Sequence, residues 1–215
     1  MQELFKTDRS FMERAARLGE RLGGREVILA SRSPRRQELL KGITGSFKTI
    51  PADIDETLPD YIPPQMASEY LAREKCLAVA HEYPDALVIG SDTTVLVDDE
   101  ILGKPANEAQ AYQMLKTLSG RSHSVVSGIA VSCNGRFKSS SDKTTVVFNE
   151  LDDKKINDYI STGSPFDKAG GYGIQDPDIK NDVYIGSGSY SNVVGLPFEE
   201  LTLLIEAFLD EEGGG

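Results

Sequence analysis

The sequence LASRSPRRQELL, residues 29–40, places three arginines at a point where a strand is expected to give way to a helix. The apolar run VILAS at 27–31 predicts the strand, and Pro34 in a first turn favours a helix over 34–43. A loop between a strand and a helix presents backbone N–H groups and the positive end of the helix dipole, which together attract anions. The stretch therefore predicts a phosphate site, with a solvated basic helix start as the alternative.

The composition of the whole chain makes this cluster of cations unusual. The 215 residues carry a formal net charge of −11, with 39% hydrophobic and 27% charged residues and a pI of about 4.7. Such an acidic chain is a poor partner for nucleic acid or for an anionic membrane, but a local cationic cluster can still hold a small phosphorylated ligand. Length and composition are typical of one globular domain.

The cysteine pattern and the lack of long apolar runs favour a cytoplasmic location. The two cysteines, Cys76 and Cys133, show neither a CxxC motif nor paired spacing, so a structural disulfide or a zinc site is not expected. No apolar run approaches the roughly 20 residues that span a bilayer, and the N-terminus lacks the apolar core of a signal peptide. We therefore expect a cytoplasmic protein with no membrane partner.

Strand-like and helix-like segments alternate along the chain. An N-terminal helical extension is expected over 1–24, ended by Gly23 and Gly24, before a single domain over 25–212. Further helices are predicted at 63–83, 107–120, 152–163 and 197–211, and strands at 86–97, 123–133 and 143–151. The alternation predicts an α/β fold, and the neighbouring strands within 123–151 predict a mixed sheet.

Three polar features are candidates for a functional role. Lys75 falls on the apolar face of the predicted 63–83 helix, which indicates either an ammonium pointed into a cleft or a side chain that snorkels at the edge of that face. Asp92 interrupts the apolar run 86–97, where a buried carboxylate is costly unless it is paired or binds a metal. A strand end or a bulge, where the aspartate caps a turn, is the alternative. The sequence DIDE at 53–56 predicts either a divalent cation site or a plain acidic loop.

A glycine-rich stretch, GSPFDKAGGYGIQDPD at 163–178, is expected to form a shaped loop that approaches a ligand closely. Within it, Lys168 adds positive charge and Gln175 adds an amide that can both donate and accept. Lys104, kept extended by Pro105, is a further candidate cation. The chain lacks a GxxxxGK(S/T) phosphate loop and a GxSxG motif, and its two histidines lack metal-ligand spacing, so a Ser–His–Asp hydrolase is not expected.

Seven stretches, taken together and in order, resemble the Maf family over about residues 27–205. They are LASRSPRRQELL, DIDE, LAREKCLAVA, VIGSDTTVLVDDEILGKP, AYQMLKTLSGRSHSVVSGIAV, DKAGGYGIQ and SNVVGLP. The resemblance implies a nucleoside triphosphate pyrophosphatase, which splits a nucleotide between the α- and β-phosphorus into a monophosphate and pyrophosphate. It also implies a Mg²⁺ or Mn²⁺ cofactor and a homodimer. The implied fold is an elongated mixed sheet flanked by helices with a central cleft, like that of the inosine triphosphate pyrophosphatases.

Residue roles follow from the same resemblance. The family's catalytic proton acceptor falls on Asp92, and Lys75 and Lys104 join it as catalytic residues. Glu56 is the candidate second carboxylate, after Asp92, for the metal. The remaining residues are those expected to bind phosphate, Ser31, Arg36 and Lys168, and those that mark the dTTP/UTP subgroup, Arg35, Thr93 and Gln175. Membership of this subgroup implies dTTP, UTP and modified uridine triphosphates as substrates.

The chain departs from the family pattern at two positions, and other functions compete with the one implied. It has Ser164 where the family usually has an acid in GEP, and Ser91 where the family usually has alanine before the catalytic aspartate. One competing function is a nucleotide-binding regulator of septum formation without catalysis; another is a purine-directed editing enzyme. Asp92 argues against the first, because a pure binder has little use for a negative charge beside a triphosphate without a metal. The subgroup-marking residues argue against the second.

Overall fold

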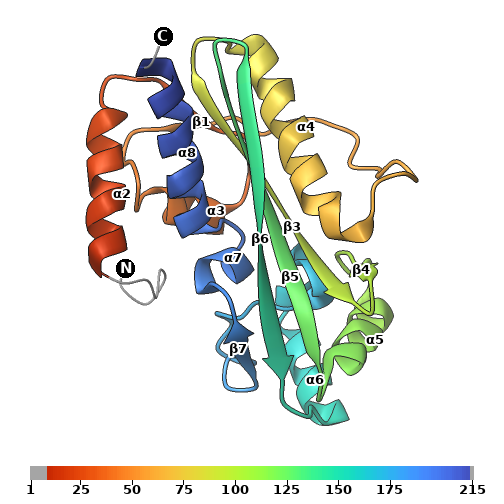
Figure 1. The fold of residues 1–215 in the computed structure, drawn as a ribbon. Coiled ribbons are helices and arrows are strands. Elements are labelled where there is room, and N and C mark those ends of the chain that lie inside the picture. Colours follow the sequence, from red (N-terminus) through yellow and green to blue (C-terminus); the bar gives the residue numbers. More distant parts are fainter. Residues whose placement is uncertain (1–8, 214–215) are drawn as a thin grey trace.

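The computed structural model describes residues 9–213, so the start of the predicted 1–24 helix and the last two residues of the chain lie outside it. Figure 1 shows an elongated molecule built around one sheet, with helices along both sides. The strands are β1 (Val27–Leu29), β2 (Lys48–Thr49), β3 (Leu87–Val97), β4 (Glu100–Leu102), β5 (Ser122–Cys133), β6 (Arg136–Phe148) and β7 (Val183–Ser187). The helices are α2 (Arg9–Arg21), α3 (Pro34–Leu40), α4 (Ala67–Glu82), α5 (Glu108–Leu118), α6 (Asp153–Ser161), α7 (Tyr190–Val194) and α8 (Phe198–Gly213), with short 3-10 helices η1 (Pro64–Met66), η2 (Ser164–Asp167) and η3 (Ala169–Gly171).

The seven-stranded sheet is mixed, as predicted. Its order is β2-β1-β3-β5-β6-β7, with β4 paired to β3 off this path. β1 runs parallel to β2 and β3, whereas the remaining pairs are antiparallel. β3 is continuous through Asp92, which pairs with Gly128 in the middle of the β3–β5 ladder. The strand-end alternative for Asp92 is therefore wrong.

The predicted helices are confirmed, with shifts at their ends. Asn107 caps α5 by accepting from the backbone N–H of Gln110, and Asp152 caps α6 by accepting from that of Lys155. The segment predicted as one helix over 63–83 opens as the 3-10 turn η1 before α4 begins.

The hairpin of β5 and β6 is longer than predicted. Asn134 and Gly135 adopt φ values of 52° and 75° and close a two-residue turn, so β6 begins at Arg136 instead of 143. The polar residues after the turn pair with β5 all the same, because backbone groups make the ladder. The prediction of a second strand confined to 143–151 is therefore wrong.

Alternate residues of the strands pack against different layers of helix. In β3, Val88 joins an apolar cluster with Cys76 of α4. The next residue, Ile89, belongs to a larger cluster that includes Leu18 of α2 and Leu201 of α8. Figure 1 shows α4 on one side of the sheet, α8 with α2 on the other, and α5 and α6 at the end of the molecule away from the β5–β6 turn. Within residues 9–213, no helix combines the length and the apolar character that crossing a membrane requires.

The N-terminal helix α2 lies against α8. Ala15 and Leu18 are fully buried there, and Arg21 pairs with Asp210 at 2.6 Å. Gly24, with a φ of 84°, follows the end of α2, in agreement with the predicted stop. The division of the chain into a 1–24 extension and a 25–212 domain stays a prediction.

Two glycines let α4 lie close on the sheet. A Cβ at Gly90 would stand 2.2 Å from the carbonyl oxygen of Ala72, and one at Gly128 would stand 2.3 Å from that of Ser68. Neither distance is tolerable for a real side chain, so glycine is needed at both positions. The close approach sets Lys75, almost one turn beyond Ala72 along α4, beside the middle of β3.

We expect Gly90→Ala to lower the free energy of unfolding by about 2 kcal/mol or more, since the added methyl group meets backbone that cannot move without shifting α4. Gly45→Ala is the matched control, because a Cβ there meets no atom of the described residues within 4 Å. Chemical denaturation of the two purified variants measures the difference. Equal stability of the two would show that the packing of α4 does not depend on Gly90.

Candidate active site

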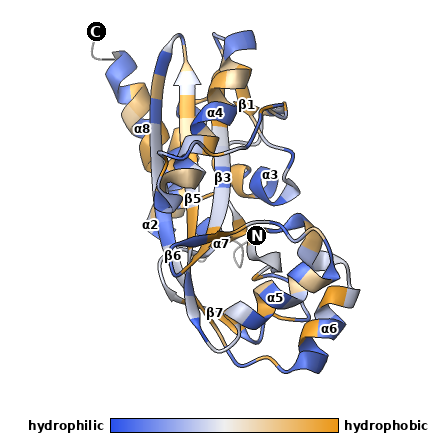
Figure 2. Cartoon of the chain, turned by 90° about the vertical axis from the view of Figure 1, so that its right-hand side faces the viewer, coloured by the Kyte–Doolittle hydropathy of each residue, from blue (hydrophilic) through white to orange (hydrophobic). Residues whose placement is uncertain are grey.

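A cavity of about 750 Å³ is lined on one side by α4 and the loop between β1 and α3, and on the other by the segment that carries η2 and η3. Figure 2 shows α3 and α4 in the upper part of the molecule and α5 and α6 in the lower part. All the residues expected in the site line this cavity: Ser31, Arg35, Arg36, Glu56, Lys75, Asp92, Thr93, Lys104, Lys168 and Gln175. The structure thus brings together residues that are far apart in the sequence.

Asp92 and Lys75 form a largely buried ion pair in the cavity. The Lys75 Nζ donates to Asp92 Oδ1 at 2.6 Å, and the side chains of Lys75 and Asp92 are only 11% and 13% exposed. The same ammonium lies 2.9 Å from Glu56 Oε1, so Lys75 does not snorkel to solvent but faces two carboxylates. Burial alone would raise the pKa of Glu56, but the hydrogen bond and charge of Lys75, with other cations nearby, hold that pKa below its usual range.

Asp92 and Glu56 suit a divalent cation that is shared with a substrate. The two carboxylates already converge on one positive charge, the ammonium of Lys75. In the part of the chain that the structure describes, no group of three or more His, Cys, Asp or Glu side chains forms a metal site by itself. Mg²⁺ at phosphate sites is commonly held by one or two carboxylates together with phosphate oxygens and water. The pair therefore fits a cation whose other ligands come from a triphosphate.

Four hydrogen bonds hold the guanidinium of Arg36 in the cavity wall. Its Nε donates to the carbonyl oxygen of Gly195 at 2.8 Å, and its Nη2 donates to the Thr93 hydroxyl at 3.1 Å. Its Nη1 donates to the carbonyl oxygen of Ser91 at 2.7 Å and to the Ser31 hydroxyl at 3.3 Å. Arg36 thus joins the loop after β1, the middle of β3 and the end of α7. Its charge is fixed in place, and its bonds within residues 9–213 leave one of its five N–H groups for a ligand.

Behind Arg36 lies a polar network that sequence reasoning missed. The Thr93 hydroxyl also contacts that of Ser127 at 2.9 Å. Ser127 donates in turn to the carbonyl oxygen of Asn192, which is fully buried. Gly195 ends α7 with a φ of 120°, and its carbonyl oxygen also accepts the hydroxyl of Ser91 at 3.1 Å. Asn192 and Gly195 belong to the stretch SNVVGLP, which resembles the family pattern as a whole. No single residue within that stretch predicts a role by itself.

Asp167, on the side of η2 and η3, shares its carboxylate between Arg35 of α3 and its own neighbour Lys168. Arg35 Nη1 lies 3.1 Å from Asp167 Oδ2, and Lys168 Nζ lies 2.7 Å from Oδ1. Lys168 also donates to the carbonyl oxygen of Ser164 at 2.6 Å and to its hydroxyl at 3.0 Å. The serine at this departure from the family pattern therefore still supplies two acceptors to Lys168. Lys104 is exposed at the cavity, and Gln175 is half-buried in its lining.

The comparison with known families agrees with this arrangement. The sequence model described as "Maf-like protein" matches residues 26–208. The chain belongs to the Maf family. Two curated relatives of this Maf protein are named dTTP/UTP pyrophosphatase. The one from Pelotomaculum thermopropionicum is 40% identical over 188 residues, covering 86% of this chain and 97% of its own length. The one from Bacillus cereus strain AH187 is 40% identical over 186 residues, covering 86% and 96%.

Among solved structures, this Maf protein resembles the Staphylococcus aureus Ham1 protein, with a TM-score of 0.52 and 17% sequence identity. The match covers 87% of this chain and 100% of the other. At this level of identity the likeness concerns the fold alone, and it confirms the expected mixed sheet flanked by helices.

Proposed function

We propose that this Maf protein hydrolyses dTTP and UTP between the α- and β-phosphorus, releasing the nucleoside monophosphate and pyrophosphate. The observation that carries the proposal is the buried pair of Asp92 and Lys75 inside a cavity lined by further cations on both sides. The cations offset the charge of a triphosphate in an acidic protein, while Asp92 supplies a base for hydrolysis. The names of the two relatives support dTTP and UTP as the substrates.

Asp92 is placed to orient a water molecule and to accept its proton. Lys75 engages only Oδ1 of Asp92 among the described residues, which leaves Oδ2 for a water. In the proposed reaction the water oxygen bonds to the α-phosphorus, the bond from that phosphorus to the bridging oxygen breaks, and the water proton moves to Asp92. Lys104 and Lys168 then offset the charge on the departing pyrophosphate.

The proposal includes a Mg²⁺ or Mn²⁺ ion held by Asp92 and Glu56 together with phosphate oxygens. When bound, such an ion acts as a Lewis acid on phosphoryl oxygens and neutralises part of the triphosphate charge. Lys75 keeps both carboxylates turned to the same point. A nucleotide-binding regulator without catalysis is the alternative, and unless it binds a metal it leaves the Asp92 carboxylate beside the triphosphate without a purpose. The homodimer and the cytoplasmic location belong to the proposal as well.

Base selection is assigned to Gln175. Uracil and thymine present an N3–H donor between two carbonyl acceptors. One amide side chain can therefore accept from the N3–H group and donate to one of the carbonyl oxygens. Cytosine reverses this pattern, which leaves polar groups unpaired in a closed site at a cost of about 1–3 kcal/mol per group. Arg35 and Thr93, both in the cavity lining, are proposed to fix the orientation of the base.

We expect the wild-type protein to prefer dTTP and UTP over CTP by about 10-fold or more in kcat/KM, and Gln175→Ala to weaken this preference more than it lowers turnover. Gln113→Ala, at an exposed position of α5, should keep the wild-type preference. The measurement is kcat/KM for dTTP, UTP, CTP and GTP on the three proteins. Equal use of UTP and CTP or GTP by the wild type, or a full preference in Gln175→Ala, would remove Gln175 from base selection.

A further inference from the structure

A largely buried hydrogen-bonded group lies at the wall of the cavity, and we call it the Tyr159 cluster: Tyr159 of α6, Ser164 of η2 and Asp176, the last of which lines the cavity. Tyr159 is 1% exposed, and its hydroxyl donates to Asp176 Oδ2 at 2.5 Å. The hydroxyl of Ser164 donates to the same oxygen at 2.6 Å. The Tyr159 oxygen also accepts the backbone N–H of Gly173 at 3.1 Å, so its donor and one of its acceptor sites are both used.

The cluster reaches the phosphate side of the cavity through Lys168. The ammonium of Lys168 lies 3.6 Å from Asp176 Oδ2 and donates to both oxygens of Ser164. The side chains of Lys168 and Asp176 are only 11% and 17% exposed. A Cβ at Gly173 would stand 2.7 Å from Asp176 Oδ1 and 2.8 Å from Lys168 Cε. The carboxylate of Asp176 and the stem of Lys168 therefore both lie against the backbone of Gly173, in space that a side chain there would fill.

The cluster reaches the base side through the backbone around Gln175. Gly173 lies two residues before Gln175, and Asp176 follows it directly. Both flanking residues bond to the hydroxyl of Tyr159, Gly173 as a donor and Asp176 as an acceptor. The backbone N–H of Asp176 also donates to the carbonyl oxygen of Gly173 at 2.9 Å, which closes the turn. One hydroxyl thus holds the chain on both sides of Gln175.

The hydroxyl of Tyr159 stays protonated and so remains a hydrogen-bond donor. Burial raises the pKa of Tyr159, and the hydrogen bond and the charge of Asp176 raise it further. The hydroxyl therefore remains protonated at physiological pH and keeps its bond to the carboxylate.

We propose that Tyr159 is a positioning residue that couples phosphate binding to base selection in this cavity. The inference rests on the proposed function, in which Lys168 faces the triphosphate and Gln175 faces the base. Through Asp176 the tyrosine hydroxyl fixes Lys168, and through Gly173 and Asp176 it fixes Gln175. A single group that touches neither the phosphates nor the base sets both contacts.

Tyr159→Phe tests the inference, because it removes the hydroxyl and keeps the buried ring. We expect KM for UTP to rise about 10-fold and the preference for UTP over CTP to fall about 3-fold or more, while kcat at saturating UTP changes little. Tyr112→Phe is the matched control. It removes a tyrosine–aspartate hydrogen bond, Tyr112 to Asp153 at 2.8 Å, outside the cavity, and should leave both quantities unchanged.

Asp176→Asn distinguishes the effect of the cluster on Lys168 from its effect on Gln175. Asparagine keeps an oxygen that accepts from both hydroxyls but lacks the charge that faces Lys168, so KM for UTP should rise while the base preference is largely retained. Wild-type KM and wild-type preference in Tyr159→Phe, even with a lower melting temperature, would overturn the inference. If Tyr159→Phe does not fold, a wild-type KM in Asp176→Asn would overturn it instead.

Calorimetric binding of UTP to the wild type and to Tyr159→Phe distinguishes this inference from the proposed function. A wild-type protein that binds UTP but cleaves no pyrimidine triphosphate would refute the proposed function alone. In that case about 10-fold weaker binding by Tyr159→Phe would still support the positioning role, and equal binding would overturn it. Absence of UTP binding by the wild type would overturn both.

Discussion

Asp92→Asn is expected to lower kcat for UTP by about 10²-fold or more, with the fold intact. Asparagine keeps the size of the side chain and an oxygen that accepts from Lys75, but it cannot take a proton from water. Lys75 retains Glu56 as a charged partner at 2.9 Å, so the substitution does not leave its ammonium unpaired. Steady-state kinetics with UTP and Mg²⁺ measures the loss, and circular dichroism checks the fold.

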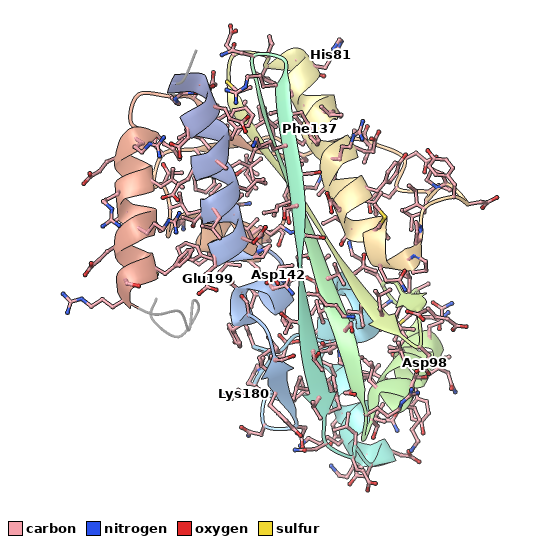
Figure 3. All side chains as sticks on the ribbon, viewed as in Figure 1. His81, Asp98, Phe137, Asp142, Lys180 and Glu199 are labelled. Carbon is pink, nitrogen blue, oxygen red and sulfur yellow. The ribbon has the colours of Figure 1, made fainter. Side chains whose placement is uncertain are left out.

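Asp98→Asn is the matched control for this substitution. Asp98 pairs with Arg121 at 2.7 Å and its side chain is 72% exposed, and Figure 3 shows it at the outer turn between β3 and β4. We expect wild-type kcat from this variant. A purified Asp92→Asn protein with turnover close to that of Asp98→Asn would give Asp92 a structural role and no part in proton transfer.

Lys75→Met is expected to lower both turnover and stability. Methionine keeps the apolar stem but removes the ammonium that Asp92 and Glu56 share. Loss of one partner from a buried ion pair costs about 3–5 kcal/mol, because the remaining charge is left uncompensated. We expect the free energy of unfolding to fall by about 3 kcal/mol. We also expect kcat to fall by about 10²-fold, since the two carboxylates lose the cation that holds them together.

The double variant Lys75→Met/Asp92→Asn shows whether the pair itself causes this loss. With both charges gone, part of the lost stability should return, and denaturant unfolding of the single and double variants measures the coupling. Lys116→Met breaks an exposed pair with Asp153, whose side chains are 50% and 65% exposed, and should change stability by less than about 1 kcal/mol. A double variant no more stable than Lys75→Met would contradict the assignment of a coupled pair.

Local chemistry made part of this structure predictable. Asn107 and Asp152 act as helix caps because their short oxygens reach free N–H groups in the first turn, a signal contained within four residues. Helical periodicity likewise predicted that Lys75 lies on the inner face of its helix. The partner of Lys75 could not be predicted in this way. Only the close packing of α4 on Gly90 shows that this face of the helix meets Asp92.

Contacts between distant residues could not be predicted in the same way. Arg36 was expected to bind phosphate, yet its Nε donates to the carbonyl oxygen of Gly195, 159 residues later in the chain. Tyr159 in an amphipathic helix is indistinguishable by sequence from an ordinary core residue, although its hydroxyl donates to the carboxylate of Asp176. The short elements β2, β4, β7 and α7 contain too few residues to show a period, and tertiary pairing defines them.

The most direct test of the proposed function is the identity of the products formed from UTP in the presence of Mg²⁺, resolved by anion-exchange chromatography. Cleavage between the α- and β-phosphorus, with Asp92 as the base, predicts UMP and pyrophosphate in equal amounts. UDP and orthophosphate as the products would contradict the proposed reaction.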